Sequence, residues 1–215
     1  CTGGLGRQRQ GPQAELLHKA LEKRLGQVRK VDFPDYASPS SALVKMYLNG
    51  DFGREPGDVN AYAASSFYAV DRFASFNRVW GADYRRGVPV LCDRYATSNL
   101  IYQLVKLPRK EWEGFIAWAE DFEYGRLGLP RPDRVIYLAM PVEVSQKLLA
   151  ARYAEKGGKK DIHENHLAFL KACAQSAAFV AEKQGWAVIP CGREGKPLPR
   201  EEIHRQVLEK ALEAL

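Results

Sequence analysis

Short apolar runs alternate along this chain with longer segments in which apolar positions recur every three or four residues. The short runs cover residues 28–33, 88–93, 134–138 and 186–191. Runs of this kind, apolar almost throughout, are typical of strands that are buried on both faces of a sheet. The longer segments predict helices over residues 13–25, 40–48, 60–81, 109–123, 142–151, 163–184 and 201–215. The alternation predicts an α/β fold, with a parallel sheet and helices on both of its faces.

The size and composition of the chain suit a single domain over residues 1–215. Hydrophobic residues make up 46% and charged residues 27% of the 215 positions, enough for a sizeable core. No apolar run approaches the roughly 20 residues that span a bilayer, and the first residues lack the apolar segment of a secretory signal. We therefore expect a cytoplasmic protein without a membrane partner.

Cysteine spacing and net charge narrow the range of ligands. Cys1, Cys92, Cys173 and Cys191 are far apart and form no CxxC pair, so a zinc site is not expected. Cys92 and Cys191 lie in apolar runs, which predicts that they are buried as small hydrophobic residues. The net charge of +6 suits an anionic partner, either nucleotide phosphates or a nucleic acid. Because the sequence has no basic helix and no platform of aromatic and basic residues, a nucleic-acid partner is not expected.

Charged and polar side chains gather where the run at residues 88–93 ends and a helix is expected to begin. Asp93 and Arg94 stand at this point, which is where ligands bind in open α/β sheets. The arginine offers a planar fork for a phosphate, and the aspartate offers oxygens for Mg²⁺ or its waters. An ion pair that only caps the strand is the alternative. The expected helix adds an unusual density of polar groups for a helix that packs on a core, namely Ser98, Asn99, Tyr102 and Gln103.

These residues form the pattern Asp93-Arg-Tyr-x-x-Ser-Asn-x-x-Tyr-Gln103, which resembles the signature of the thymidylate kinase family. Further segments resemble that family in the same order: Phe33-Pro-Asp-Tyr36, Tyr68-Ala-Val-Asp-Arg72, Leu129-Pro-Arg-Pro-Asp133, and the residues from Arg152 to Glu164. The resemblance covers nearly the whole chain after Gln13. It implies a P-loop NTPase fold with a parallel five-stranded sheet. The first strand and the P-loop are expected to be truncated or altered, since only two residues precede Gly3.

The resemblance also implies an activity and its partners. The family transfers the γ-phosphoryl group of MgATP to dTMP, giving dTDP and ADP, while Mg²⁺ bridges the phosphates. Asp93, Arg94 and Arg152 are the implied catalytic residues, and Asp93 is the implied metal ligand. Relatives are homodimers that pair through helices, and the helix expected over residues 60–81 is a candidate for that interface.

The implied dTMP site draws on several segments. Tyr68 and Arg72 share one face of a helix, so the ring can stack on thymine while the arginine donates to a base carbonyl. A core aromatic is the alternative reading of Tyr68. The role of Asp35 is open, because many relatives have Arg or Glu at its position. The family pattern further implies Asn99 as a base contact, Tyr102 under the sugar, Arg94 and Tyr36 at the monophosphate, and Phe33, Ser98 and Gln103 as supporting residues.

A basic segment with a glycine hinge, over residues 152–161, resembles the family's lid. Its cations are Arg152, Lys156, Lys159 and Lys160. Closure of such a loop over ATP would bring positive charge to the transferred group and exclude water. Arg152 is the expected closing arginine, and Lys160 is a further expected ATP contact. A solvated surface loop is the alternative.

The P-loop itself departs from the pattern G-x-x-x-x-G-K-[ST]. When the helix that follows the loop is aligned, the family's lysine falls on Gln10, its Mg²⁺-binding hydroxyl on Gly11 and its acidic residue on Gly6. Arg7 and Arg9 restore positive charge to the loop, but they do not restore the geometry of the family's phosphate-binding loop. Loss of one preorganised donor costs about 10²–10³ in rate, so we expect the chain as written to be a very poor kinase. The expected ATP-binding positions of the loop are Gly6, Arg7, Arg9, Gln10, Gly11 and Pro12.

Two other functions stay open. One is a kinase for a different nucleotide or deoxynucleoside, although Asn99 and Tyr102 favour dTMP. The other is a pseudokinase that binds a nucleotide or forms a dimer without turnover, which the altered loop favours. Turnover of ATP with dTMP separates these classes.

The altered loop predicts a specific DNA sequence. When the possible codons of residues 4–10 are read one base later, they can encode Gly-Leu-Asp-Gly-Ser-Gly-Lys, the family's loop. We therefore predict that the loop is a frameshifted reading of a normal P-loop, and that the loss of a single base near residues 11–12 restores the frame. Resequencing the gene tests this prediction. Codons that exclude the shifted reading would indicate a divergent natural N-terminus instead.

Overall fold

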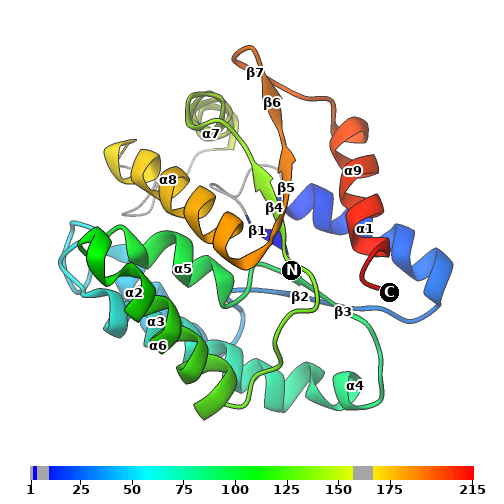
Figure 1. Cartoon of the computed structure of the whole chain (residues 1–215), viewed down its shortest axis with the longest axis horizontal. Coiled ribbons are helices and arrows are strands. Elements are labelled where there is room, and N and C mark those ends of the chain that lie inside the picture. The colour runs from blue at the N-terminus through cyan, green and yellow to red at the C-terminus, as the bar shows by residue number, and fades with distance from the viewer. Residues whose placement is uncertain (1, 4–9, 157–166) are drawn as a thin grey trace.

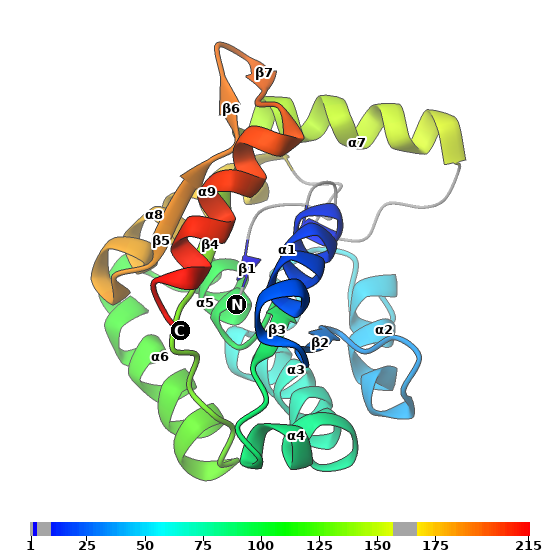
Figure 2. The same cartoon turned by 90° about the vertical axis from the view of Figure 1, so that its right-hand side faces the viewer.

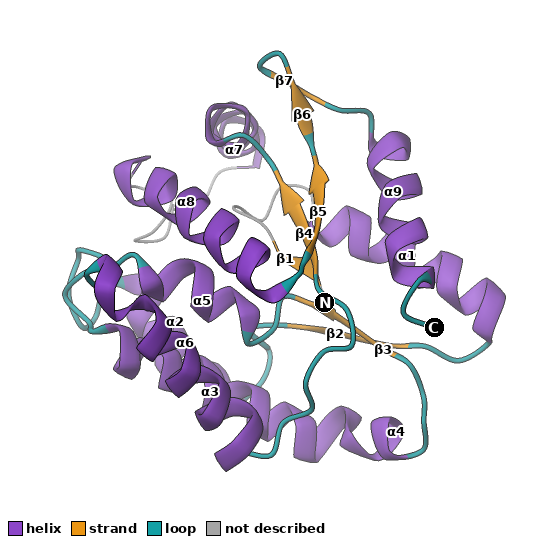
Figure 3. Cartoon of the chain, in the orientation of Figure 1, coloured by secondary structure: helices purple, strands orange, loops and turns teal. Residues whose placement is uncertain are grey.

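A five-stranded parallel sheet forms the centre of the molecule (Figure 3). The computed structural model describes residues 2–3, 10–156 and 167–215. The strands lie in the order β2-β3-β1-β4-β5, and every neighbouring pair is parallel. Each strand that an apolar run predicted is shorter than its run. The strands are β1 (Thr2–Gly3), β2 (Arg29–Asp32), β3 (Val90–Asp93), β4 (Ile136–Ala139) and β5 (Ala187–Pro190).

Helices make up most of the remaining described chain (Figure 1). None of them, within the described ranges, has the length and apolar character needed to cross a membrane. The α-helices are α1 (Gln10–Leu25), α2 (Ala42–Asn49), α3 (Ala61–Ser75), α4 (Gly81–Arg85), α5 (Thr97–Leu104), α6 (Trp112–Glu120), α7 (Val142–Lys156), α8 (Leu167–Gln184) and α9 (Arg200–Leu212). The 3₁₀ segments are η1 (Pro39–Ser41) and η3 (Arg109–Glu111), and the π-helical segments are η2 (Phe76–Trp80) and η4 (Asp121–Arg126).

The helix predicted over residues 60–81 does not end at its glycine. α3 passes through η2 into α4, which ends at Arg85. Gly81 serves a close contact rather than a helix end, because a Cβ at this position would lie 2.5 Å from the carbonyl oxygen of Phe76. In the same way, η4 extends the helix predicted over residues 109–123 as far as Arg126. Both long helices therefore contain π-helical turns, which occur frequently at functional sites.

The two faces of the sheet carry different helices (Figure 1, Figure 2). α1 and α9 pack together on one face, and α3, α5 and α8 lie on the other. Successive residues of β4 alternate between the two layers. Ile136 and Leu138 join the apolar cluster that contains Leu17 of α1, whereas Tyr137 joins the cluster formed with α5 and α8. The core thus has two layers, as expected for strands that are buried on both faces.

Two short strands after β5 form an antiparallel hairpin that the apolar pattern did not predict. They are β6 (Gly192–Arg193) and β7 (Lys196–Pro197). Strands of two residues are too short to show an alternation of apolar and polar positions. In Figure 1 the hairpin projects beyond the end of β5, next to the chain that leads into α9.

The predicted burial of two cysteines is confirmed. Cys92 is 4% exposed and Cys191 is 0% exposed, and neither forms a disulfide in the described part of the chain. Burial raises the pKa of the Cys92 thiol to about 12. A thiol with so high a pKa is inert near neutral pH, because the thiolate is the form that binds metals and attacks electrophiles. These cysteines therefore act as packing groups.

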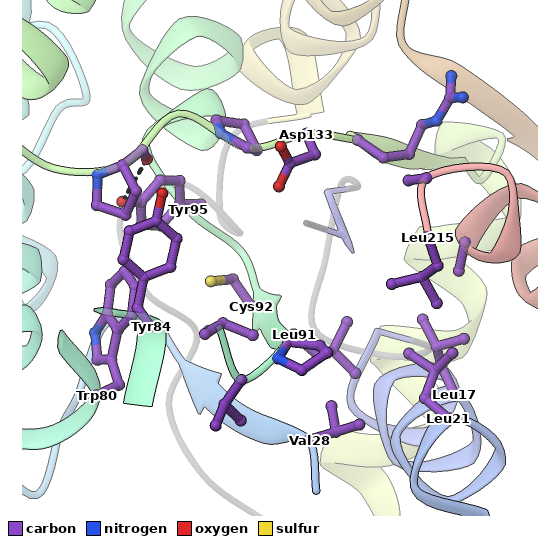
Figure 4. Close-up of a pocket in the computed structure, with 18 of the residues that line it drawn as sticks. Leu17, Leu21, Val28, Trp80, Tyr84, Leu91, Cys92, Tyr95, Asp133 and Leu215 are labelled. Atoms are coloured by element: carbon purple, nitrogen blue, oxygen red, sulfur yellow. Dashed lines mark hydrogen bonds between the residues drawn. The ribbon is translucent and has the colours of Figure 1, made fainter. Parts of the chain in front are cut away.

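A cavity lies beside the short central strand (Figure 4). The first strand, expected to be truncated or altered, has two described residues, and Thr2 pairs with Asp93 of β3 and Ile136 of β4. In the described part of the chain, the start of β3 therefore has no partner on the β1 side. The cavity has a volume of about 290 Å³ and is lined by Leu91 and Trp80, among others. It contains none of the residues predicted to bind dTMP or ATP, so we do not assign the nucleotide to it.

Lys106 follows α5 and forms hydrogen bonds with α2 and with the segment that precedes α3. Its Nζ donates to the Tyr47 hydroxyl and to the carbonyl oxygen of Val59, each at 2.8 Å. Burial lowers the pKa of Lys106 from 10.5 to about 8, because the ammonium is less well solvated than in water. Above about pH 8 the folded protein thus loses a proton that the unfolded chain retains.

The stability of the fold should therefore rise with pH through Lys106. Between pH 8 and pH 10.5 the unfolded chain binds more protons at this residue than the folded chain, so the free energy of unfolding increases. Urea denaturation of the wild type and of Lys106→Met, from about pH 7 to about pH 10, measures the effect. We expect the wild type to gain stability relative to the variant above about pH 8. A difference that stays constant with pH would contradict the lowered pKa.

Candidate active site

The carboxyl edge of the sheet brings the predicted phosphate residues together. Asp32 at the end of β2 is in register with Asp93 at the end of β3. The segments that follow the two strands therefore lie side by side, and the N–H of Phe33 donates to the carbonyl oxygen of Asp93 at 3.0 Å. Phe33 itself is buried, at 5% exposure. This arrangement sets residues 33–36 next to the Asp-Arg pair of the motif.

The buried carboxylate of Asp71, on α3, binds the loop that follows β2. Asp71 is 1% exposed, and its oxygens accept hydrogen bonds from the Asp35 N–H at 2.9 Å and from the Ser40 hydroxyl at 2.6 Å. The contact fixes the backbone on both sides of Tyr36, whose side chain remains accessible at 37% exposure. Asp35 thus contributes its backbone N–H to this contact. Sequence reasoning missed Asp71, and its one signal is a carboxylate that directly precedes Arg72.

Arg94 reaches the same region from the end of β3, in an unusual backbone conformation. Its φ of 65° lies in the left-handed region, which residues other than glycine rarely adopt. Nη1 donates to the Tyr102 hydroxyl at 3.4 Å, and the guanidinium carbon lies 5.5 Å from the centre of the Tyr102 ring. Burial lowers the pKa of Arg94, but Tyr102, Asp93 and Tyr36 raise it by more, so the net direction is upward. These three residues thus keep Arg94 a permanent cation, as a phosphate site requires.

A second polar cluster joins α3, α5 and η4. Arg72, which is 2% exposed, donates from Nε to Glu123 Oε2 at 2.8 Å and from Nη2 to Glu123 Oε1. Asn99 Nδ2 donates to the same Oε1 at 3.2 Å. Burial lowers the pKa of Arg72, but Glu123 raises it by more, so Arg72 stays charged. Glu123 therefore connects two of the predicted base contacts. Sequence reasoning missed it, because a single glutamate in a helical pattern usually faces solvent.

The remaining predicted dTMP residues are in the same region with fewer defined contacts. Tyr68 is half-buried and meets Tyr47 edge-on, with ring centroids 6.4 Å apart, which suits both a stacking ring and a core aromatic. The Ser98 hydroxyl and both amide atoms of Gln103 are buried without a hydrogen-bond partner among the described residues. Their supporting roles at the dTMP site stay predictions.

Half of the predicted ATP residues fall outside the described ranges. Arg152 belongs to α7, which runs five residues beyond the predicted helix to Lys156, but its side chain is not described. Gln10 begins α1, with Gly11 and Pro12 in the first turn. The amino end of a helix is a natural anion site, yet this turn has neither an ammonium nor a hydroxyl side chain. The positions that lie outside the description are Gly6, Arg7, Arg9 and Lys160.

Comparisons with known proteins point to one family. A profile of the thymidylate kinase family matches residues 11–205. Thymidylate kinase of Mycobacterium tuberculosis (strain CDC 1551 / Oshkosh) is 28% identical over 175 residues, which are 80% of this chain and 79% of that protein. Thymidylate kinase of Caenorhabditis elegans is 26% identical over 164 residues, which are 72% of this chain and 65% of that protein.

A solved structure shows the fold. Thymidylate kinase from Candida albicans aligns with a TM-score of 0.70 at 19% identity, covering 99% of this chain and 91% of that chain. The expected P-loop NTPase fold is thereby confirmed. The profile match begins at Gly11, after most of the altered loop.

The left-handed backbone at Arg94 leads to a prediction about stability. This conformation costs roughly 1–2 kcal/mol for residues other than glycine. Arg94→Gly removes that cost and Arg94→Ala keeps it, while both variants lose the guanidinium. In urea denaturation we therefore expect the free energy of unfolding of Arg94→Gly to exceed that of Arg94→Ala by about 1 kcal/mol. An alanine variant as stable as the glycine variant would show that the backbone is not strained here.

Proposed function

The chain belongs to the thymidylate kinase family, and from this premise we propose that it transfers the γ-phosphoryl group of MgATP to dTMP, giving dTDP and ADP. The observation that carries the proposal is the pairing of two polar clusters beside the carboxyl edge of the sheet. One holds the cation Arg94 beside Tyr102, and the other holds Arg72 and Asn99 on neighbouring helices. A nucleoside monophosphate has a phosphate at one end, which suits the cluster with Arg94, and a base at the other end, which suits the cluster with Arg72 and Asn99.

We assign the residues along dTMP from one end to the other. Arg94 would bind the monophosphate oxygens, with the accessible Tyr36 beside it. Tyr102, whose hydroxyl accepts from Arg94, would lie under the sugar and disfavour a 2′-hydroxyl. Arg72 and Asn99 would meet the base. Tyr68 would stack on the ring, as aromatic side chains stack on a pyrimidine.

The end of β3 suits Mg²⁺ that arrives with ATP. This ion is usually held by one or two carboxylates together with phosphate oxygens and water. Asp93 supplies one half-buried carboxylate next to β1. The bound ion would neutralise charge on the phosphate oxygens. Asp93 would therefore hold the ion or its waters, while Arg94 holds the acceptor phosphate beside it.

Phosphoryl transfer depends on position and positive charge rather than on a covalent intermediate. Arg94 would supply charge at the acceptor phosphate, and Arg152 on α7 would supply it at the donor. The first turn of α1 offers backbone N–H groups to ATP, but Gln10 stands where an ammonium is needed. We therefore propose slow turnover for the chain as written.

The same turn favours a second candidate function. With Gln10 and Gly11 in place of a lysine and a hydroxyl residue, the donor phosphates lose their main side-chain contacts. The dTMP residues do not depend on this turn. A protein of this kind could bind a nucleotide without turning it over, as a pseudokinase.

We also propose a homodimer that pairs through α3. Three apolar side chains of this helix are exposed, Tyr62 at 40%, Val70 at 40% and Phe73 at 43%. Their spacing puts them on one face of the helix. Clustered apolar side chains on a surface favour a protein interface, and sedimentation velocity reports the stoichiometry.

Restoring the loop separates the kinase from the pseudokinase. In the triple variant Gly6→Asp, Gln10→Lys, Gly11→Ser, the ATP site regains an acid, an ammonium and a hydroxyl. We expect turnover of dTMP with MgATP, followed by ADP release, to exceed that of the chain as written by about 10²-fold or more. The affinity for dTMP, measured by calorimetry, should be the same in both proteins, because the monophosphate residues are unchanged.

Arg94→Ala in the restored background is the control, and it should lose turnover because the acceptor phosphate loses its cation. Equal turnover before and after restoration would contradict our account of the loop. If neither protein turns over ATP while both bind dTMP, the pseudokinase is the better description.

A further inference from the structure

Glu123 is a buried carboxylate with no part in the proposed phosphoryl transfer. It lies on the π-helical segment η4 and is 2% exposed. A buried charge is costly unless it is paired and hydrogen-bonded. Its hydrogen-bond partners in the described chain are Arg72 and Asn99, the two residues to which we assign recognition of the base.

The hydrogen bonds of Glu123 leave little freedom to either partner. Arg72 directs Nε and Nη2 at the two carboxylate oxygens, with Nε to Oε2 at 2.8 Å. Asn99 Nδ2 donates to Glu123 Oε1 at 3.2 Å and to the carbonyl oxygen of Ser65 at 3.4 Å. Because both N–H groups of the Asn99 amide are used on this side, its oxygen Oδ1 must point another way.

Arg72 still has N–H donors, and Asn99 still has an acceptor, for a ligand. Nη1 of Arg72 and Oδ1 of Asn99 form no hydrogen bond with any residue in the described part of the chain. A donor next to an acceptor complements a base edge on which a carbonyl oxygen lies next to a ring N–H, as in thymine and uracil. Cytosine presents the reverse pair, an amino donor next to a ring nitrogen that accepts.

Resting on the proposed function, we propose that Glu123 is a positioning residue that sets base specificity. Its carboxylate fixes the Asn99 amide and the Arg72 guanidinium, so that they accept from and donate to a keto pyrimidine and reject cytosine. Glu123 itself does not touch the substrate. The rejection follows because a mismatched base leaves buried polar groups unpaired.

Glu123→Gln keeps the shape of the side chain but ends its ability to accept all three hydrogen bonds. One end of the new amide is a donor, which conflicts with an N–H of Arg72 or Asn99. The conflict is relieved if the Asn99 amide flips. The flipped amide presents its NH₂ group to the base in place of Oδ1. We therefore expect the ratio of dTMP affinity to dCMP affinity to fall by about tenfold or more.

Asp83 provides a matched control at the opposite edge of the sheet. It is 5% exposed and forms ion pairs with Arg29, the first residue of β2, and with Arg86. Asp83→Asn likewise replaces a buried carboxylate between guanidinium groups by an amide. Both variants should lower the thermal midpoint of unfolding, but Asp83→Asn should leave the dTMP to dCMP ratio unchanged.

Calorimetric titration of the full chain with dTMP and with dCMP measures this ratio in the wild type and in both variants. We expect the wild type and Asp83→Asn to prefer dTMP equally, and Glu123→Gln to lose that preference. A wild-type ratio in Glu123→Gln would overturn the role of Glu123 while the proposed function still stands on the preference of the wild type. A wild type that does not bind dTMP would instead overturn the proposed function, and this inference with it.

Glu123→Asp keeps the proposal testable if Glu123→Gln does not fold. The shorter carboxylate still compensates the charge of Arg72 but does not reach Arg72 and Asn99 together. We expect this variant to be more stable than Glu123→Gln and to show a reduced dTMP to dCMP ratio. A folded Glu123→Asp with the wild-type ratio would overturn the inference.

Discussion

Arg72 carries a positive charge into the interior between α3, α5 and η4, where 2% of its surface is exposed. The forked ion pair with Glu123 compensates that charge, and Asn99 shares the same carboxylate. Removal of one partner from a buried pair costs about 3–5 kcal/mol, so the pair strongly constrains how the three segments approach one another. α5 follows directly after β3 and Arg94. The geometry of the phosphate end therefore depends on the same packing as the base end.

The residues that we assign to the monophosphate belong to one part of the described chain. Its described contacts come from residues between Phe33 and Glu123, at the ends of β2 and β3 and on the helices beside them. The predicted ATP residues whose backbone the structure describes lie elsewhere, in the first turn of α1 and on α7. We therefore expect a change in the loop to lower turnover more than it lowers the affinity for the monophosphate. Such a separation would allow an altered P-loop and an intact dTMP motif to occur in one chain.

Sequence reasoning predicted those residues of the candidate site that a local pattern encodes. An apolar run followed by an Asp-Arg pair marks the end of a buried strand, and the polar face of the next helix marks the neighbouring contacts. Glu123 and Asp71 were missed because their hydrogen-bond partners are distant in sequence: Arg72 is 51 positions from Glu123, and Asp35 is 36 positions from Asp71. The same limit applies to the fold. Gly81 resembled a helix end but serves a close contact with Phe76, and strands of two residues such as β1 show no periodicity.

We propose that dTMP binds across the two clusters without help from the P-loop. A crystal structure of the unmodified chain with dTMP tests it most directly. We predict the base against Arg72 and Asn99, with Glu123 behind them, and the phosphate on Arg94. A nucleotide bound elsewhere, for example in the cavity beside Leu91 and Trp80, or no bound nucleotide at saturating dTMP, would contradict the claim.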